Sequence, residues 1–356
     1  MRIGLICPYS LTMPGGVQSQ VLALARALRR RGHAVRVLAP CDGPPPDAGV
    51  TPLGLSLPAS ANGSVAPVAP DPSAQLRVIR AMRDEAFDVI HLHEPLAPGP
   101  TMTALLTHPA PLIGTFHAAG RSLSYELMPK AVRYLARRLD DRVVVSEDAR
   151  KLAMEHLGGE YHILFNGVEV SRYRKSSAYA TDRPTVLFIG RHEQRKGLQV
   201  LLEAVKLLPS DTRVWIAGSG PETQKLKTQY GADLRLEWLG SIDETEKIAR
   251  LRGADVFCAP SLFGESFGLV LLEGMAAGTP VVASDLGGYA NAARNGRDAL
   301  LFPAGDHKAL AGVIGELLRD KNRAAALVAS ANERADEFSM ARLADLYLER
   351  YRALLR

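Results

Sequence analysis

Two glutamates mark the stretch of this 356-residue chain that is best suited to chemistry. Glu265 and Glu273 stand eight residues apart in SLFGESFGLVLLEGMAAGTPVVASD, at the two ends of an apolar run that glycines bound. Buried without partners, each carboxylate would cost several kcal/mol or take up a proton. We therefore expect polar groups to meet both of them. The paired hydroxyls of a sugar or a ribose fit that need better than structural ion pairs do.

The residues after Glu265 add backbone donors to this stretch. The sequence Glu265-Ser266-Phe267-Gly268 precedes an expected helix, so the N–H groups of Phe267 and Gly268 are placed to bind a ligand where that helix begins. Glu273 follows two turns later, on about the same face. Together these groups predict a sugar-binding segment.

Two glycines near the start of the chain have the spacing of an anion site. Gly15 and Gly16 directly follow the first expected strand and open a helix. Glycines at such a place let backbone N–H groups approach an anion closely, and the helix dipole favours negative charge. Gln18, one turn into the helix, is placed to reach the same ligand. Taken alone, such a glycine pair is more often an ordinary turn at a helix start.

A cationic loop follows the first strand of the second half. The segment GRHEQRKG carries Arg191, Arg195 and Lys196 between two glycines. Cations at the carboxyl end of a strand suit a diphosphate, which needs Arg and Lys donors. A solvated charge run is the alternative reading. Since Gly15 and Gly16 offer a second anion-binding element, we favour the diphosphate.

The elements that position these residues alternate between short β-rich runs and helical patterns. This alternation is typical of parallel α/β sheets. It lapses in a polar, strand-poor stretch and then restarts, so we predict two doubly wound Rossmann-like domains with a ligand cleft at the carboxyl ends of both sheets. The predicted parts are an N-terminal domain over 1–168, a linker over 169–183, a C-terminal domain over 184–338, and an amphipathic helix over 339–356.

Charge and composition indicate where the chain works. Lys and Arg outnumber Asp and Glu by 20 to 15 in residues 1–180, whereas the count is 23 to 23 in residues 181–356, so the net charge of +5 lies in the first half and favours an anionic partner there. No signal-peptide pattern is present, and no 18 uncharged apolar residues run together. The cysteines show no metal or disulfide spacing. We expect a cytoplasmic protein.

A basic amphipathic segment lies within that first half. In DPSAQLRVIRAMRDEAF, Arg77, Arg80 and Arg83 recur every three residues among apolar side chains. Such a helix can lie on an anionic bilayer, or it can pack normally with a solvated basic edge.

Other function classes fit the residues less well. The segment AGSGPE (217–222) offers half of the dinucleotide fingerprint of an NAD-dependent oxidoreductase, but lacks the third glycine and places an acid where the pyrophosphate would lie. A nucleic-acid-binding protein would need an aromatic stacking set, and aromatic residues make up only 6% of the chain. His91 and His93 share one side of a strand without a third ligand at suitable spacing, so no metal site is predicted.

The motifs together resemble the retaining GT-B glycosyltransferases of family 4. The resemblance rests on the glutamate pair in GESFGLVLLE, the GGV turn, NGV at 166–168 and the Arg191 to Lys196 loop, and it spans nearly the whole chain. More narrowly, MRIGLICPYSLTMPGGVQSQV, NGSVA (62–66), HLHEPLAP and GTFHA are similar to members that move mannose from GDP-mannose to phosphatidylinositol. The loop from Arg191 to Lys196 is one residue shorter than in those members. The resemblance therefore does not assign the roles of Glu193 and Arg195.

This resemblance implies a role for each matching residue. Glu273 would hold the ribose hydroxyls, and Glu265 with the backbone of Phe267 and Gly268 would hold the donor sugar. The expected diphosphate ligands are Arg191, Lys196 and Gly16. The residues expected beside the reacting mannose and the acceptor are His117, Tyr9, Gln18, Asn62 and Ser64.

The resemblance also implies a mechanism and a location. Negative charge grows on the departing diphosphate, and no DxD triplet occurs in the chain, so we expect fixed cations to act where other transferases use a divalent metal. The expected place is the inner face of the cell membrane, with phosphatidylinositol or another anionic lipid as partner. The alternative is a UDP-glucose or UDP-N-acetylglucosamine donor with another lipid, sugar-phosphate or polysaccharide acceptor. The sequence predicts no oligomeric state.

Overall fold

The structure is a computed structural model that describes residues 1–13, 15–61, 64–118, 125 and 128–356. Its contacts divide the chain into two compact units, which are described separately. The first unit contains residues 1–167 and 340–356, and the second contains residues 168–339.

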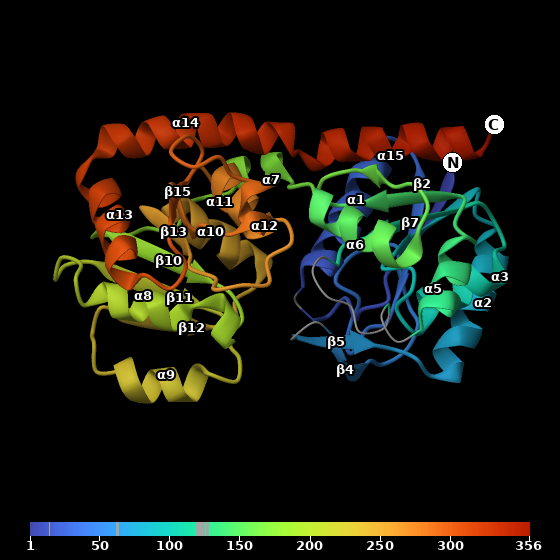
Figure 1. The fold of residues 1–356 in the computed structure, drawn as a ribbon, viewed down its shortest axis with the longest axis horizontal. Helices are drawn as coiled ribbons and strands as arrows, with labels where there is room; N and C mark the ends of the chain where they lie inside the picture. The colour runs from blue at the N-terminus through green and yellow to red at the C-terminus, as the bar shows by residue number, and fades with distance from the viewer. Residues whose placement is uncertain (14, 62–63, 119–124, 126–127) are drawn as a thin grey trace. The chain divides into compact units, whose positions relative to one another are not determined.

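The first unit is built on a parallel sheet to which the labelled strands β2 and β7 belong (Figure 1), and β1 lies near the centre of the strand order. Every strand pair in it is parallel, so all its carboxyl ends meet at one edge. In spatial order the strands are β3 (Val50–Pro52), β2 (Ala34–Ala39), β1 (Arg2–Ile6), β6 (Val89–His93), β7 (Leu112–Phe116), β8 (Asp141–Val144) and β9 (His162–Ile163).

Helices cover both faces of this sheet, because its strands are apolar on both sides. One buried cluster joins the sheet to α2, α3, α5 and α6, and a second joins it to α1 and α15. The last helix of the chain is therefore part of the first unit's core. The bounds are α1 (Gly16–Arg30), α2 (Pro72–Glu85), α3 (Pro100–Thr107), α5 (Pro129–Ala136), α6 (Glu147–Leu157) and α15 (Met340–Leu354).

A small antiparallel hairpin adjoins the loop that follows β1. It consists of β4 (Leu57–Ala61) and β5 (Ser64–Val68). Tyr9 forms an isolated bridge with Val68, and the N–H of Ser10 donates to the carbonyl of Pro67 over 2.8 Å. The hairpin is thereby attached close to the start of α1.

The second unit repeats the doubly wound plan with strand order β12-β11-β10-β13-β14-β15, again all parallel. Its first strand in the chain, β10, also lies near the centre. The strands are β10 (Thr185–Ile189), β11 (Arg213–Ala217), β12 (Leu236–Gly240), β13 (Val256–Ala259), β14 (Val281–Ser284) and β15 (Leu300–Phe302).

One core cluster joins this second sheet to α8, α9, α13 and α14, while α11 contacts α7, α10 and α14. The helices are α7 (Val170–Lys175), α8 (Leu198–Val205), α9 (Thr223–Tyr230), α10 (Glu244–Gly253), α11 (Leu269–Ala277), α12 (Gly287–Ala290), α13 (His307–Arg319) and α14 (Lys321–Glu337), with a 3₁₀ turn at Gln194–Lys196.

The predicted linker over 169–183 differs from the structure. It contains helix α7, and the contacts assign the whole segment to the second unit. Val170 and Tyr173 of α7 are only 7% and 3% exposed, and Arg252 donates to the carbonyl of Tyr173 over 3.2 Å. The sequence pattern hid this helix because it has a single turn and many charged residues.

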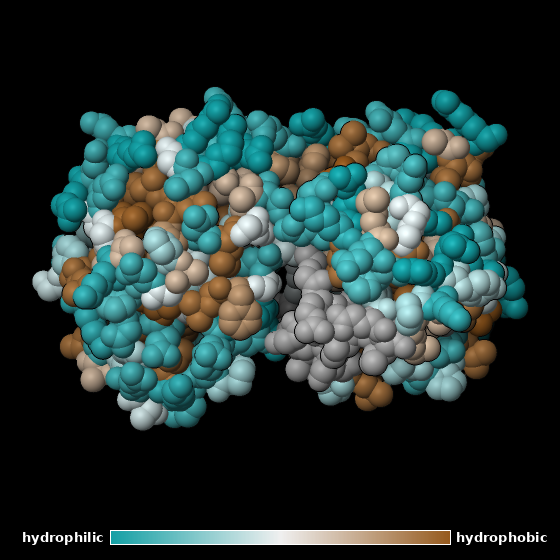
Figure 2. All heavy atoms as spheres, viewed as in Figure 1, coloured by the Kyte–Doolittle hydropathy of each residue, from teal (hydrophilic) through white to brown (hydrophobic). Residues whose placement is uncertain are grey.

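The prediction of two doubly wound α/β sheets is confirmed. On the face drawn in Figure 2, hydrophilic residues cover most of each unit's surface, with smaller hydrophobic areas between them. Within the described part of the chain, no helix combines the length and the apolar character that crossing a bilayer requires.

Candidate active site

The loop after β10 forms a compact set of ion pairs in the second unit. Glu193 accepts from Arg191 over 3.0 Å and from Arg195 over 2.9 Å. Its side chain is 12% exposed, whereas that of Arg191 is 44% exposed. Glu193 thus holds two arginines of the predicted diphosphate loop in place, a structural role that the sequence left open.

Glu265 meets the same loop from the other side. Its carboxylate accepts from Nζ of Lys196 over 2.6 Å and lies 3.8 Å from Nη1 of Arg195. The hydroxyl of Ser261 also donates to it over 2.8 Å, and that hydroxyl is 2.9 Å from the hydroxyl of Tyr289. Sequence analysis missed Ser261 and Tyr289, since a serine after a strand and a tyrosine 24 residues beyond Glu265 carry no pattern.

The start of α11 presents backbone donors next to Glu265. Gly268 caps this helix in the left-handed region with φ of 87°, and no side chain caps the helix. The first N–H groups of α11 are therefore available to an anion or a sugar oxygen. Gly288 allows this arrangement, because a Cβ there would lie 1.7 Å from the carbonyl oxygen of Glu265.

The other predicted donor-site residues lie in the same segment but differ in exposure. Phe267 is 4% exposed and its ring packs edge-on against Phe338, so only its backbone can serve a ligand. The carbonyl of Ser266 accepts from the side chain of Asn291 over 3.2 Å. These contacts fix the turn that leads into α11.

Glu273 has a cation of its own. Nζ of Lys247 donates to Glu273 over 2.9 Å and to Glu244 over 3.0 Å. Lys247 lies on α10, which Asp243 caps by accepting from the N–H of Glu246. Sequence analysis missed Lys247, since a lysine beside glutamates is typical of any exposed helix.

Both glutamates therefore meet cations, the arrangement that the sequence analysis ranked below hydroxyl binding. Their side chains remain 11% and 13% exposed. An ion-paired carboxylate still has lone pairs for hydroxyl donors. Binding of sugar or ribose hydroxyls by Glu265 and Glu273 stays a prediction.

His192 connects the cationic loop to the loop over 217–222. Its Nδ1 lies 2.9 Å from the hydroxyl of Thr223, and its carbonyl accepts from the N–H of Glu222. The glycines of AGSGPE serve this packing, because a Cβ on Gly220 would lie 2.6 Å from the carbonyl oxygen of His192. The segment that resembles half of a dinucleotide fingerprint is thus a structural support for the loop.

In the first unit, Glu94 and His117 occupy the carboxyl ends of β6 and β7. The backbone N–H of His117 donates to Oε1 of Glu94 over 2.8 Å, and the N–H of Glu94 donates to the carbonyl of Thr115. Glu94 is 8% exposed and adopts φ of 49°. Burial raises its pKa to about 7 despite the backbone hydrogen bonds, which act in the opposite direction.

His117 is buried among other neutral groups. It is 9% exposed, and its Nε2 lies 3.0 Å from Nδ1 of His93. Burial lowers the pKa of His117 to about 4, while a hydrogen bond with the Asn166 side chain opposes this shift. The His117 ring is neutral at pH 7 and can orient a hydroxyl without carrying charge. Glu94 was missed by sequence analysis, although it directly follows β6, and an acid in that place is a signal that the sequence offered.

His91 and His93 lie on one face of β6, with ring centroids 4.2 Å apart. His91 contacts the hydroxyls of Tyr351 and Thr115 over 2.7 Å each, and burial lowers its pKa to about 3. Nε2 of His93 is buried without a partner in the described part of the chain, which leaves it for water or a ligand. In that same part of the chain, no group of three or more His, Cys, Asp or Glu side chains could hold a metal ion, and metal independence stays a prediction.

Gly15, Gly16 and Gln18 lie at the start of α1, and Tyr9 lies in the loop after β1. Gly15 is the N-cap of α1, and a Cβ on Gly16 would meet no atom within 4 Å. Gln18 is 7% exposed and its Nε2 donates to the carbonyl of Ser10 over 3.4 Å. Burial raises the pKa of Tyr9, and the nearby Glu94 adds to this shift. Asn62 lies outside the described residues, and Ser64 begins β5.

The three arginines predicted to face a membrane all lie on α2, which Asp71 caps. Arg80 and Arg83 are exposed and each pairs with Asp84, at 3.4 and 3.2 Å. Arg77 differs, since it donates to the carbonyl of Leu53 over 2.9 Å and thereby ties α2 to the loop after β3. The exposed face of α2 also carries Leu76 and Ile79, with exposures of 68% and 41%.

Comparison with known proteins identifies the class to which this fold and these residues belong. The model of Glycosyltransferase Family 4 matches residues 14–172, and that of Glycosyl transferases group 1 matches residues 169–334. The chain belongs to the GT-B glycosyltransferases of family 4 and is an enzyme of that kind. It is 43% identical over 90% of its length to the phosphatidyl-myo-inositol mannosyltransferase of Mycobacterium leprae, 88% of which is covered.

Further relatives agree with this assignment. The chain is 33% identical to the phosphatidyl-myo-inositol mannosyltransferase of Propionibacterium freudenreichii over 99% of this chain and 90% of the relative. Two solved structures share the fold. They are the sucrose-phosphate synthase of Thermosynechococcus elongatus (TM-score 0.78, 21% identity, 99% of both chains) and a glycosyltransferase of Rickettsia africae (TM-score 0.74, 17% identity, 100% and 98%). The resemblance to family 4 is confirmed, and the oxidoreductase alternative is excluded.

Proposed function

We propose that this protein transfers mannose from GDP-mannose to the inositol of phosphatidyl-myo-inositol, at the inner face of the cell membrane. The observation that carries the proposal is the 43% identity over 90% of the chain with a relative of that name. The local geometry of each unit supports it. The second unit offers cations and carboxylates suited to a nucleotide sugar, and the first offers neutral polar groups suited to a hydroxyl acceptor.

In the proposed reaction, cations of the second unit stabilise the leaving diphosphate. The bond from the anomeric carbon to phosphate breaks, so negative charge grows on the β-phosphate. Arg191 and Lys196 are held by Glu193 and Glu265, which fixes them before the charge develops. Glu265 and the first N–H groups of α11 would bind the sugar, and Glu273 the ribose. We expect turnover to persist in EDTA, since fixed cations supply the charge.

In the first unit, the proposed role of His117 is to orient the reacting sugar or the acceptor hydroxyl. A ring whose pKa is about 4 carries no charge at pH 7, so it neither competes for the diphosphate nor repels the donor. We propose that Tyr9, Gln18, Asn62 and Ser64 contact the acceptor. We also propose front-face attack with retention, in which a β-phosphate oxygen takes the proton of the acceptor hydroxyl.

A second candidate acceptor comes from another relative. The chain is 29% identical over 95% of its length to the D-inositol 3-phosphate glycosyltransferase of Xylanimonas cellulosilytica. A soluble inositol phosphate shares the inositol ring with the lipid acceptor but has no acyl chains. A UDP-linked donor would accompany this alternative.

One product assay separates these candidates. Purified protein is incubated with GDP-mannose, UDP-glucose or UDP-N-acetylglucosamine and with either phosphatidylinositol vesicles or D-inositol 3-phosphate. The proposal predicts a lipid product one hexose heavier, formed from GDP-mannose, with an α-linked sugar by NMR. A product formed only from the soluble acceptor would select the second candidate, and no transfer with any pair would discard both.

The proposed membrane contact uses the exposed face of α2. Arg80, Arg83, Leu76 and Ile79 combine cations and apolar side chains on one face, as in helices that lie on anionic bilayers. Replacing Arg80 and Arg83 with Gln should weaken binding to vesicles rich in phosphatidylinositol by about 1 kcal/mol for each charge. The matched control is Arg137→Gln, an exposed arginine of the same unit. Equal binding by wild type and the double variant at low salt would contradict this role of α2.

A further inference from the structure

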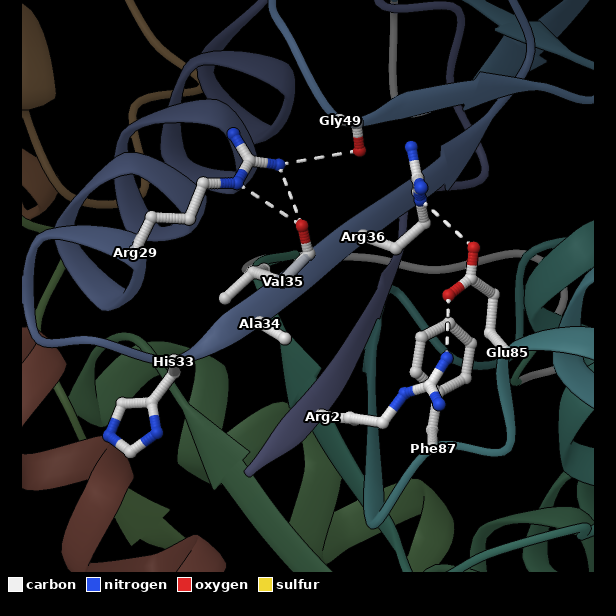
Figure 3. Close-up of a pocket in the computed structure, with 9 residues that line it drawn as sticks. All are labelled: Arg2, Arg29, His33, Ala34, Val35, Arg36, Gly49, Glu85 and Phe87. Carbon is white, nitrogen blue, oxygen red and sulfur yellow. Dashed lines mark hydrogen bonds and ion pairs between the residues drawn. The ribbon is translucent and has the colours of Figure 1, made fainter.

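A cavity of about 350 Å³ opens at the edge of the first sheet opposite to the residues of the candidate active site (Figure 3). Arg2 begins β1, residues 33–36 include the start of β2, and Phe87 precedes β6, so the cavity lies at the amino ends of these strands. His117 and Glu94 lie at the carboxyl ends. Three arginines and one carboxylate, Glu85, provide the charged lining.

Arg29 is fixed against the wall of this cavity. Its Nε and Nη2 donate to the carbonyl of Val35 over 3.1 and 3.0 Å, and Nη2 also donates to the carbonyl of Gly49 over 3.3 Å. Burial lowers the pKa of Arg29, and the nearby Arg36 and Arg26 also lower it while Asp47 raises it. Across the described residues, no acceptor meets Nη1 of Arg29. This arginine is rigid and keeps one donor group for a ligand.

Arg36 and Arg2 share the single carboxylate of the cavity. Nε of Arg36 donates to one oxygen of Glu85 over 3.1 Å, and Nη2 of Arg2 donates to the other over 3.2 Å (Figure 3). Both guanidinium groups are open to solvent, with exposures of 41% and 52%. No described residue accepts from the two Nη groups of Arg36 or from Nε and Nη1 of Arg2.

The charges of the cavity do not balance within the protein. Three guanidinium groups face one carboxylate. Two further acids lie near the cavity but are not among its lining residues: Asp88 accepts from the backbone N–H of Arg2 over 2.7 Å, and Asp47 pairs with Arg26 over 2.8 Å. His33 adds a polar ring whose pKa is lowered, mainly by burial, which disfavours its positive form. Among the residues that line the cavity, positive charges therefore exceed negative ones by two, which favours an anion.

We propose that this cavity binds a phosphoryl group carried by a small molecule or by a lipid headgroup. Guanidinium groups bind phosphate oxygens in pairs, and three of them line this cavity with donors that no described residue uses. The volume exceeds what a bare phosphate requires, so a small organic body fits beside Ala34 and the buried ring of Phe87. Glu85 is the internal competitor, because it occupies donors of both Arg2 and Arg36 and is the last residue of α2.

The test exploits this competition. Binding of inorganic phosphate to the full-length protein is measured by isothermal titration calorimetry for wild type, Arg36→Gln and Glu85→Gln. Arg36→Gln should weaken binding about tenfold or more, since it removes a charged donor pair. Glu85→Gln should strengthen binding, since it releases both arginines. Arg137→Gln is the matched control and should match wild type within about twofold.

A different result is expected if Glu85, Arg2 and Arg36 serve only to attach α2 to β1 and β2. In that case Arg36→Gln and Glu85→Gln both break the Arg36–Glu85 ion pair, both lower the thermal stability of the fold and both leave phosphate binding equal to wild type. That outcome would overturn the proposal. Repeating the titration with Lys196→Ala separates the cavity from the candidate active site, because the phosphate binding that depends on Arg36 should persist there.

A second arm distinguishes the two sources of the phosphoryl group. Vesicles containing phosphatidic acid are sedimented with wild type, Arg36→Gln and Arg83→Gln. Free phosphate binding that depends on Arg36 assigns a soluble ligand. Sedimentation that depends on Arg36, without binding of free phosphate, assigns a headgroup. If neither measurement depends on Arg36, no phosphoryl site exists in this cavity.

Discussion

The carboxyl ends of the two sheets carry opposite kinds of polar chemistry. In the second unit the polar groups are ionised and paired, with Lys196 on Glu265 and Lys247 on Glu273, and they keep some contact with solvent. In the first unit the histidines are buried and neutral at pH 7, with the pKa of His117 lowered to about 4 and that of His91 to about 3. The histidines are buried without an opposite charge beside them, which favours their neutral form. The glutamates of the second unit are buried beside lysines, which favours their ionised form.

This contrast suits the two halves of a glycosyl transfer. A leaving diphosphate gains charge, so it is best met by cations that are already fixed in place. An acceptor hydroxyl must be oriented without being trapped by charge, so neutral hydrogen-bonding rings serve it better. If the contrast is correct, charged side chains should matter for turnover in the second unit, and neutral buried side chains should matter in the first.

The largest expected effect comes from removing a fixed cation of the second unit. Lys196→Ala should lower kcat/KM for the proposed mannosyl transfer by about 10² to 10³, the usual cost of losing a preorganised stabiliser of developing charge. Steady-state rates measure this loss. Lys206→Ala is the control, because that lysine is exposed and pairs only with Glu203 and the Tyr230 ring. Wild-type rates in Lys196→Ala would show that this cation does not stabilise the leaving diphosphate.

The next effect concerns Glu94, a buried acid of the first unit. The pKa of Glu94 is raised from 4.5 to about 7 by burial, so the folded state binds the proton more tightly than the unfolded state does. Wild type therefore loses stability as pH rises from about 4.5 to about 7. Glu94→Gln carries no such penalty. Relative to wild type it should gain up to roughly 3 kcal/mol between pH 4.5 and pH 8.

Native-state hydrogen exchange of the amides in β6 and β7 measures this difference locally, which suits a chain with two units. The exposed Glu160 supplies the control, since Glu160→Gln should follow wild type at every pH. A constant difference between Glu94→Gln and wild type across this range would show that folding does not raise the pKa of Glu94, so that its carboxylate is ionised at pH 7. The first unit would then not be neutral.

A matched pair of tyrosines compares the two units directly. Tyr351→Phe removes the hydroxyl that meets Nδ1 of buried His91 over 2.7 Å, and should cost about 1–3 kcal/mol. Tyr289→Phe removes a hydroxyl from Ser261, which keeps Glu265 as its acceptor, so its cost should be about 1 kcal/mol or less. Exchange of the amides in α15 and α11 reports the two costs. Equal losses of stability would contradict the inference that His91 loses a needed hydrogen-bond partner while Ser261 keeps one.

Local spacing was enough to predict the doubly wound fold and the segments that carry the site. Strand-helix alternation marked both sheets, the apolar run between Glu265 and Glu273 marked these two glutamates, and a glycine pair before a helix marked Gly16. The sequence did not predict which side chains from other elements contact the site residues. Lys247 reaches Glu273 from another helix, and His93 reaches His117 from the neighbouring strand. No pattern within one segment encodes such pairs, because sheet order decides which strand ends meet.

The smallest expected effect on stability tests whether the first unit contributes to anion binding. Gly16 is the first residue of α1, and a Cβ there would meet no protein atom within 4 Å, so folding does not require glycine. Gly16→Ala should stabilise the fold by up to about 1 kcal/mol, because alanine lowers the entropy of the unfolded chain. If a diphosphate approaches this backbone as proposed, the added methyl group should nevertheless weaken GDP binding at least several-fold.

Gly15→Ala is the contrasting variant. A Cβ at Gly15 would lie 2.3 Å from Oε1 of Gln18, so that side chain would have to move. A variant that is more stable yet binds GDP less tightly can only have lost room for the ligand, which separates function from folding at a single methyl group. Calorimetric titration with GDP, together with thermal unfolding, gives both quantities. Unchanged GDP affinity in Gly16→Ala would assign the diphosphate to Arg191 and Lys196 without help from α1, and would make the division between the charged and neutral sites complete.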